Sequence, residues 1–343
     1  MCNIAGYVGS QKAVPILLKM IKAQEGLNGG FYSGVAVHDG KNLHYRKTQG
    51  DFNALLNQSD VESLLGNTGI IHSRTPSGGD SSWAHPFTTI RDGELKFCYV
   101  ANGAMSFFKY RQQEYNLIAN DLQENGFDIP CKLVINDSRY CKLSNGESVH
   151  MSDVMCQLIY KYKASGQNLV KAMTSAFCQM PSEIVGLSIE KESDDRIYFS
   201  RINKPMFIGF DETGAYLASS PTAFPSSVKE YKLLPALSSG VVYKDRYEVV
   251  KYGKVDFTVK GFNKRTVEKA KKIILDLLSN GQYGFSDMTK AFNKKTYKGV
   301  PPQTDAIIYL AIDGLLKENK IGCVSSVRVH GEQTAPKTLF KKL

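Results

Sequence analysis

The chain begins MCNIAGYVG (residues 1–9), and these residues constrain its architecture more than any later segment. Their apolar side chains alternate loosely up to Gly9, as they would in a short buried strand. Residues 13–24 then follow the period of an amphipathic helix. The opening of the chain therefore predicts a strand followed by a helix.

Cys2 would combine two reactive groups if Met1 were removed, and a small second residue permits that removal by an aminopeptidase. The processed residue would carry a thiol, which is a strong nucleophile, and an α-amine with a reference pKa of about 7.7 to 8.0, which accepts a proton near neutrality. One residue would then supply both the nucleophile and the base. Taken alone, an ordinary buried cysteine explains this position more simply.

The composition is that of an ordinary soluble globular protein, with 42% hydrophobic and 22% charged residues in a chain of 343. This length predicts two domains, a core of about 250 residues and a smaller unit. No apolar run reaches the roughly 18 residues of a membrane span, and the first residues lack the features of a signal peptide. We therefore expect a cytoplasmic protein that has no membrane partner.

The seven cysteines form an odd set without a CxxC pair, which argues against a disulfide framework and against a structural zinc site. We expect no metal and no cofactor. The net charge of +10 is unevenly distributed: residues 261–343 contain 15 Lys and Arg against 7 Asp and Glu, or +8, which leaves +2 for the residues before them. The basic excess therefore belongs to the C-terminal segment.

Hydrophobic periodicity predicts many antiparallel strands and two blocks of helices before residue 250. Asp39-Gly40 is a strong hairpin signal between two of the strands. Two sheets covered by helices would accommodate this order. The expected strands are 3–8, 33–37, 43–47, 69–72, 97–101, 183–189, 196–200, 206–210, 215–219 and 240–243, and the expected helices are 13–24, 110–124, 152–164 and 169–179.

The character of the sequence changes near residue 250, where basic residues become more frequent. Three helices and a small hairpin within about 80 residues are the outline of a winged helix, so we expect residues 261–343 to form a separate winged-helix-like domain. The expected elements are a basic amphipathic helix over 264–278, a helix over 287–293 capped by Ser286, a helix over 304–318, and strands around a polar turn within 321–329.

Blocks spread over roughly residues 1–245 resemble, in order and spacing, those of class II glutamine amidotransferases, above all the glutaminase half of glucosamine-6-phosphate synthase. MCNIAGYVG is similar to the family's MCGIxGYxG. The other blocks are LNGGFYSGVAV, GNTGIIHSR, AHPF, VANGAM, SRINKPMFIGF and YLASSPTAF. The resemblance implies an α+β protein in which residues 1–250 form the four-layer αββα sandwich of the N-terminal-nucleophile (Ntn) hydrolases, with Cys2 as the nucleophile.

The resemblance also implies roles for further residues. Arg74 matches the arginine that grips the glutamine α-carboxylate, a task that suits a bidentate guanidinium, and Ser77 falls where a hydroxyl contacts the same carboxylate. Asn102 and Gly103 match the pair whose side-chain amide and backbone N–H form the oxyanion hole. Outside the family, a surface arginine and ordinary turn residues would explain the same positions.

The chain also departs from the family pattern. Asn28 and Thr75 replace a family arginine and a family tryptophan, which indicates a remodelled pocket wall. Met151 aligns with the aspartate that binds the glutamine α-amine, and a thioether cannot pair with an ammonium group. Either Asp153 or Asp137 takes over this role, with Asp153 as our candidate, or the substrate is not glutamine itself. We expect His85 and His150 to be hydrogen-bonded structural residues.

Three functions are compatible with these patterns. The first is an enzyme that releases ammonia from glutamine through a Cys2 thioester and delivers it to an acceptor or synthase partner on another chain, because no synthase half is recognisable after residue 250. The second is a hydrolase of a different small amide. The third is an amino-acid-sensing regulator whose tail binds protein or nucleic acid. We expect the tail to take no part in hydrolysis, because the glutaminase-like blocks are complete by Tyr243. We expect it to dock protein rather than DNA, because its third helix carries Asp305 and Asp313 where phosphate contacts would need Lys or Arg.

Overall fold

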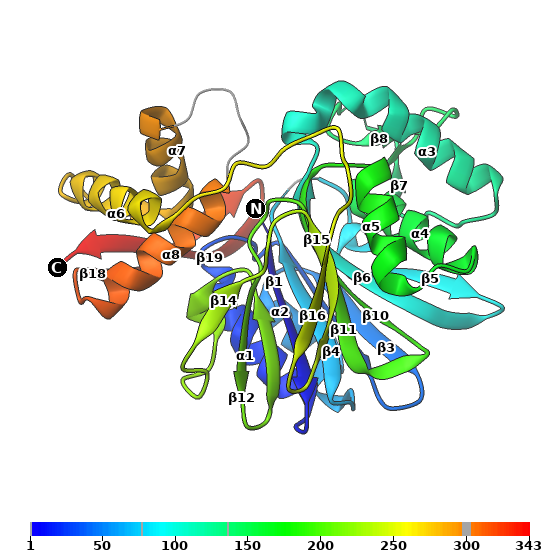
Figure 1. Ribbon diagram of the computed structural model, residues 1–343, viewed down its shortest axis with the longest axis horizontal. Coiled ribbons are helices and arrows are strands. Elements are labelled where there is room, and N and C mark those ends of the chain that lie inside the picture. The colour runs from blue at the N-terminus through cyan, green and yellow to red at the C-terminus, as the bar shows by residue number, and fades with distance from the viewer. Residues whose placement is uncertain (1, 77, 136, 297–302) are drawn as a thin grey trace.

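The computed structural model describes residues 2–76, 78–135, 137–296 and 303–343. Ser77 and Met1 therefore lie outside the described residues. Two β-sheets pack face to face with helices on both outer sides, and the C-terminal elements lie at one side of this body (Figure 1). No helix in these ranges combines the length and the apolar character that crossing a membrane requires.

The first sheet has seven strands, and all neighbouring strands are antiparallel. Its central strands β1 and β4 are almost entirely buried, because both faces of the sheet are covered. In spatial order the strands are β14 (Tyr231–Leu233), β12 (Phe207–Asp211), β13 (Gly214–Ala218), β1 (Asn3–Gly9), β4 (Thr68–Arg74), β2 (Tyr32–His38) and β3 (Leu43–Gln49).

The second sheet has six strands and is also antiparallel. A hydrophobic cluster fills the space between the two sheets, with Ile4 and Ile70 from the first sheet and Val100, Leu187 and Phe199 from the second. In spatial order its strands are β16 (Tyr247–Lys251), β15 (Ser238–Tyr243), β11 (Ser193–Arg201), β10 (Glu183–Glu190), β6 (Glu94–Ala104) and β5 (Phe87–Arg91).

Helices form the two outer layers. α1 (Ala13–Glu25) and α2 (Phe52–Gln58) pack on the outer side of the first sheet. α4 (Met151–Ala164) and α5 (Leu169–Gln179) pack on the outer side of the second, and α3 (Gln112–Glu124) packs against α4. The layers are therefore helix, sheet, sheet and helix, as the sequence predicted. A small third sheet lies beside α3 and consists of β7 (Lys132–Leu133), β9 (Ser148–Val149) and β8 (Cys141–Lys142).

The C-terminal segment contains three helices and a long hairpin. The sheet order is β17-β19-β18. The hairpin differs from its prediction, because residues 321–330 form a single strand and the turn follows at Gly331, where φ is +59°. The elements are α6 (Lys264–Leu278), β17 (Tyr283–Gly284), α7 (Phe285–Thr296), α8 (Thr304–Lys317), β18 (Ile321–His330) and β19 (Gln333–Lys342).

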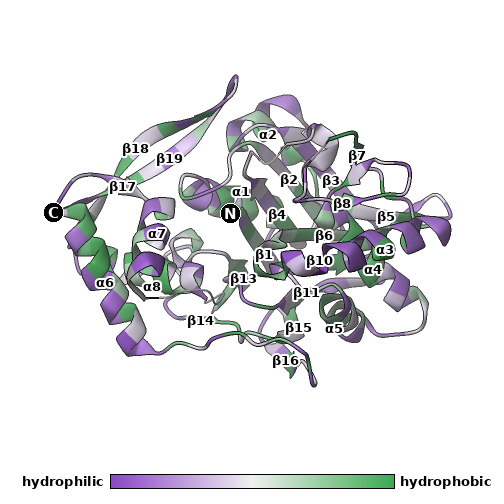
Figure 2. Cartoon of the chain, turned by 90° about the horizontal axis from the view of Figure 1, so that it is seen from above, coloured by the Kyte–Doolittle hydropathy of each residue, from purple (hydrophilic) through white to green (hydrophobic). Residues whose placement is uncertain are grey.

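The C-terminal segment shares a hydrophobic core with the body of the chain. Leu27 and Phe207 of the body belong to the same buried cluster as the inner faces of α6, α7 and α8. The hairpin, which Figure 2 shows at the edge of the molecule, is held by backbone groups after α1. Thr338 N–H donates to Gly26 O at 2.7 Å, and the Arg328 guanidinium donates to Gly29 O at 3.0 Å. The segment is thus docked onto the body by polar and apolar contacts.

Candidate active site

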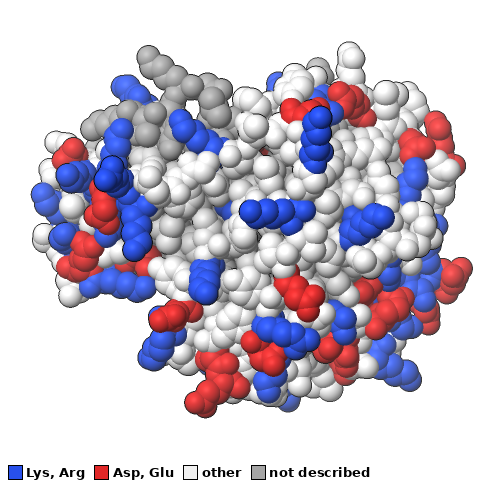
Figure 3. Space-filling model, in the orientation of Figure 1, with Lys and Arg blue, Asp and Glu red and all other residues white. Residues whose placement is uncertain are grey.

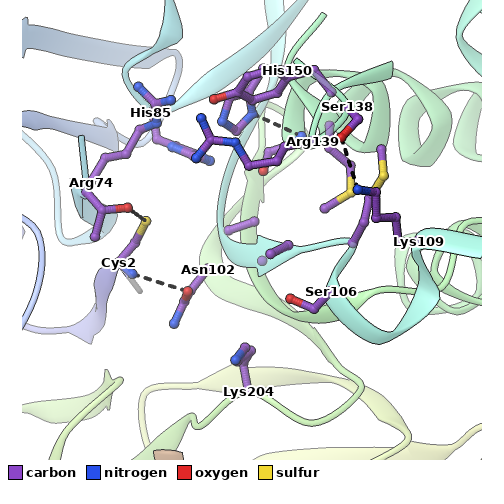
Figure 4. A pocket seen from close by; sticks show the side chains of 18 residues that line it. Cys2, Arg74, His85, Asn102, Ser106, Lys109, Ser138, Arg139, His150 and Lys204 are labelled. Carbon is purple, nitrogen blue, oxygen red and sulfur yellow. Dashed lines mark hydrogen bonds between the residues drawn. The ribbon is translucent and has the colours of Figure 1, made fainter. Parts of the chain in front are cut away.

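A cavity of about 430 Å³ opens at the start of β1 and at the ends of β4 and β6 (Figure 4). Four residues that the sequence singled out line it together: Cys2, Arg74, Asn102 and Gly103. Strand pairing explains part of this convergence. Asn3 pairs with Ser73 in the antiparallel ladder, so Cys2, one residue earlier, lies opposite Arg74, one residue later.

Asn102 connects the second sheet to Cys2. It lies near the end of β6, is buried, and accepts a hydrogen bond through Oδ1 from the Cys2 N–H at 3.2 Å. Its Nδ2 is buried and has no hydrogen-bond partner among the described residues. Gly103 follows in the same strand. A Cβ at this position would lie 2.8 Å from Ile184 Cγ1, so any residue larger than glycine would force Ile184 to move. Asn102 thus binds the Cys2 nitrogen through Oδ1, and its Nδ2 is available to donate a hydrogen bond to a ligand.

The Cys2 thiol lies in a surrounding that favours the thiolate. Burial by itself raises the pKa of this thiol, but the charge and hydrogen bond of the His72 imidazole, together with the N-terminal charge and a backbone hydrogen bond of Thr75, lower the pKa to about 6. His72 lies on β4 two residues before Arg74 and faces the second sheet, where its Nε2 meets Ala101 O at 3.0 Å. The Cys2 Sγ also contacts Thr75 Oγ1 at 3.8 Å. A lowered thiol pKa is typical of a nucleophilic cysteine.

Arg74 is held from several sides. Only 1% of the residue is exposed, and its Nη2 donates to Gly78 O at 2.9 Å. The guanidinium carbon lies 4.7 Å from the centroid of the Tyr32 ring and 5.8 Å from that of Trp83. These contacts fix the plane of the guanidinium beside the cavity, as bidentate binding of a carboxylate requires.

Asp153 does not line the cavity. This residue of α4 is fully buried, and its carboxylate accepts hydrogen bonds from the Cys131 N–H at 3.3 Å and from Gln157 Nε2 at 3.3 Å. Burial raises its pKa to about 6. Met151, one of the first residues of the same helix, lines the cavity instead. Asp153 is therefore not among the groups that can contact a substrate in this structure.

His85 and His150 both line the cavity. His150 caps α4, because its Nδ1 accepts from the Ser152 N–H at 3.1 Å. The ring of His85 stacks on His72, with centroids 3.8 Å apart. Burial, aided by the neighbouring positive groups, lowers the pKa of both His85 and His150 well below the usual range, so both imidazoles are neutral. The cap agrees with a structural role for His150.

Lys109, Arg139 and Lys204 also line the cavity, and sequence analysis did not single them out. Lys204 follows β11 and pairs with Asp305 of α8, with Nζ and Oδ2 2.8 Å apart. The wall of the cavity is thereby linked to the C-terminal segment. A second link is close by, since Asn28 Nδ2 donates to the Tyr309 hydroxyl of α8 at 3.1 Å. Lys109 and Arg139 lie between the recognised blocks, and Lys204 lies inside SRINKPMFIGF at a position to which the resemblance assigned no role, so only the folded chain reveals them at the cavity.

No protein-family model matches the chain. Among curated proteins, the isomerizing glutamine-fructose-6-phosphate aminotransferase of Bacteroides thetaiotaomicron is 28% identical over 291 residues, a match that covers 82% of this chain and 41% of the relative. The protein of the same name from Thermococcus kodakarensis is 24% identical over 251 residues and is covered to 37% of its length. The chain thus spans about two fifths of the length of these curated relatives.

Among solved structures, the glutamine phosphoribosylpyrophosphate (PRPP) amidotransferase from B. subtilis, complexed with ADP and GMP, matches with a TM-score of 0.59 at 15% identity. The match covers 88% of this chain and 65% of that one. At this identity the similarity concerns the fold alone. The names of the relatives agree with the prediction of an enzyme family, and what each relative acts on is a property of that relative. In sequence and in fold, the chain therefore resembles the class II glutamine amidotransferases, as its sequence blocks predicted.

Proposed function

We propose that the chain is an amide hydrolase of the amidotransferase type that releases ammonia from a carboxamide through a thioester on Cys2. The observation that carries this proposal is the double role of Asn102, whose Oδ1 holds the Cys2 nitrogen while its buried Nδ2 remains available as a donor. A nucleophile, its base and an oxyanion donor thereby surround one point of the cavity. This is the set of groups that acyl transfer requires.

The reaction proceeds in two steps. The Cys2 sulfur attacks the carboxamide carbon, and Asn102 Nδ2 together with the Gly103 N–H stabilises the oxyanion. The α-amine of processed Cys2 carries the thiol proton to the departing nitrogen, so that ammonia leaves as the thioester forms. Water then attacks the thioester, which yields a carboxylic acid and restores the thiol. Arg74 holds a carboxylate of the substrate, and glutamine is the reference substrate that the relatives' names suggest.

We also propose that the ammonia acceptor is bound by a partner on another chain. The cytoplasmic location also stays a prediction.

We further propose that residues 261–343 form a winged-helix-like unit. The order helix, short strand, two helices and hairpin supports this proposal, and so does the sheet order β17-β19-β18. Lys and Arg gather over this side of the molecule (Figure 3), and the exposed face of α6 carries Lys264, Arg265, Lys269 and Lys272.

A DNA-binding role for the third helix of this unit is disfavoured by its burial. α8 contributes mostly buried residues, and its polar side chains are engaged within the chain. Asp305 pairs with Lys204, while Asp313 accepts from the Tyr231 hydroxyl and pairs with Lys317 at 2.8 Å. The face that would enter a DNA groove is therefore occupied by the body of the chain. A protein partner could still bind the exposed face of α6.

The test of the proposed function is ammonia release from a set of small carboxamides, combined with peptide mass mapping. We expect at least one carboxamide to be hydrolysed, Met1 to be absent from the active protein, and Cys2→Ala to abolish turnover while the circular dichroism spectrum is retained. A Cys2→Ala protein that keeps a tenth of the activity, or an equally active form that still carries Met1, would refute the assignment.

A further inference from the structure

Apart from the Cys2 thiolate, the charged side chains that line the cavity are cationic. The lining comprises 18 residues, of which Arg74, Lys109, Arg139 and Lys204 carry positive charge and none is Asp or Glu. The residues outside the described ranges have no carboxylate side chain either. Figure 4 shows these cations on different sides of the space in front of Cys2. A ligand that fills the cavity therefore meets positive charge from several directions and no lining carboxylate.

The carboxylates near this space are already engaged. Asp137 accepts from the Arg139 side chain, with Nε and Oδ2 2.8 Å apart, and from the Arg139 N–H at 2.8 Å. Asp305 approaches Lys204 from α8, outside the cavity lining. Asp153 faces the interior of its own layer, as described above. None of the three presents an unoccupied carboxylate to the cavity.

One wall of the cavity is formed by the start of α4. His150, the N-cap of this helix, and Met151, its first residue, both line the cavity there. Met151 is 5% exposed, so its thioether forms a dry, apolar piece of the lining. His150 is neutral, because burial lowers its pKa. An ammonium group placed here would lose its hydration and gain no countercharge, and both effects weaken binding of a cation.

We propose that the substrate of the Cys2 site is a carboxamide that carries a carboxylate and no free ammonium group. Arg74 would hold the carboxylate, the amide would lie at Cys2 and Asn102, and the carbon that bears an ammonium in glutamine would carry an uncharged substituent beside Met151. Four cationic side chains and no carboxylate in the lining favour such an anion over zwitterionic glutamine, whose ammonium group finds no carboxylate there. This inference rests on the proposed hydrolysis at Cys2 and specifies its substrate class.

The decisive experiment compares two substrates of equal length. Glutaramate is glutamine with a hydrogen in place of the α-ammonium group. We expect the processed protein to hydrolyse glutaramate with a kcat/KM at least about tenfold above that for glutamine. A preference for glutamine would overturn the inference and leave the proposed function standing. Failure to release ammonia from either compound or from any other carboxamide would remove the proposed function, and this inference with it.

A pair of variants locates the cause of the preference. Met151→Asp introduces a carboxylate into the apolar wall. Met151→Asn introduces a side chain that has the shape of aspartate but no charge. We expect the ratio of kcat/KM for glutamine to that for glutaramate to be at least about tenfold higher in Met151→Asp than in Met151→Asn. Equal ratios in two folded variants would contradict the role of charge at this wall. The wild-type comparison decides the substrate class even if a variant fails to fold.

Discussion

Asn102 uses the two ends of its side-chain amide for different purposes. Oδ1 accepts from the Cys2 N–H, and Nδ2 remains without a partner among the described residues. Because an oxyanion needs its donor chiefly in the transition state, we expect Asn102→Ala to lower kcat by roughly 10²- to 10³-fold and to leave KM nearly unchanged. Asn102→Asp keeps an acceptor for Cys2 but loses the donor, so it should be similarly slow. Steady-state ammonia release measures both, and an active Asp variant would exclude Nδ2 as the oxyanion donor.

The Cys2 thiol should be ionised at neutral pH because its pKa is lowered to about 6 against the effect of burial, with His72 as the largest of the groups that lower it. The rate of its alkylation should therefore fall as the pH decreases through about 6. His72→Phe keeps an aromatic ring and removes the imidazole, so the thiol pKa should rise and the alkylation curve should move to higher pH. Iodoacetamide labelling followed by peptide mass mapping measures this, with buried Cys98, whose pKa burial raises, as an internal control. An unchanged curve would show that His72 does not tune the thiol.

Single residues could be assigned from the sequence where they lie inside a recognised block, and not elsewhere. Cys2, Arg74, Asn102 and Gly103 meet at one cavity because Cys2 precedes β1, Arg74 ends the neighbouring strand β4, and Asn102 and Gly103 lie near the end of β6 in the second sheet. Asp153 was placed by alignment, but α4 begins at Met151 and turns about 100° per residue, so position 153 faces about 200° away from position 151. Lys109 lies between the recognised blocks and Lys204 lies inside one at a position without an assigned role, so only tertiary folding brings them to the cavity.

At the scale of elements, long segments with a regular apolar period were predictable, and very short helices and short edge strands were not. The helix over 264–278 and the helix over 169–179 have the predicted bounds, because each has a clear apolar face. α2, with seven residues, and the edge strands β14 and β16 were missed. Their burial patterns are too short or too exposed to produce a period. Packing against neighbouring elements, which the local sequence does not encode, stabilises them.

Glu25, the last residue of α1, joins three elements through a buried carboxylate. It accepts from the Ser73 hydroxyl of β4 at 2.6 Å and from the Phe52 N–H of α2 at 3.1 Å. Burial raises its pKa from 4.5 to about 7, despite these hydrogen bonds. A raised carboxyl pKa contributes stability that is fully present below about pH 4.5 and is lost as the pH rises through about 7.

We therefore expect the free energy of unfolding of the wild type, relative to Glu25→Gln, to decrease by roughly 2 to 4 kcal/mol between about pH 5 and pH 8. The glutamine variant does not titrate at this position, so it supplies the reference at each pH. Urea unfolding at a series of pH values measures the difference. A constant difference would mean that the Glu25 pKa is not shifted.

At the scale of the whole molecule, the C-terminal segment is attached to the wall of the cavity. The sequence predicted its helices but not its partner, because nothing local in α8 indicates that Tyr309 will meet Asn28 or that Asp305 will meet Lys204. The contacts of Asn28 and Thr75 show where the two departures from the family pattern lie in the structure. Asn28 contacts α8, and Thr75 contacts the Cys2 sulfur, so both departures lie at surfaces that the chain itself remodels.

Truncation after Lys260 tests whether the stability and the activity of the remaining protein depend on the C-terminal segment. The sequence alone suggested that the shortened protein would keep its amidase activity. The shared core changes this expectation, because removal of the segment exposes Phe207 and Leu27, and each large apolar side chain transferred to water costs about 1.5 to 3 kcal/mol. Lys204 would also lose Asp305, its partner at 2.8 Å.

We expect the truncated protein to unfold at a lower temperature by at least several degrees and to lose most of its kcat/KM for the preferred carboxamide. Differential scanning calorimetry and ammonia release on the same preparation separate the two effects. Lys269→Ala, on the exposed face of α6, is the matched control and should leave both values unchanged. A truncated protein with wild-type stability and activity would show that the docked segment contributes nothing to the Cys2 site, and the contact between Lys204 and Asp305 would then have no part in shaping it.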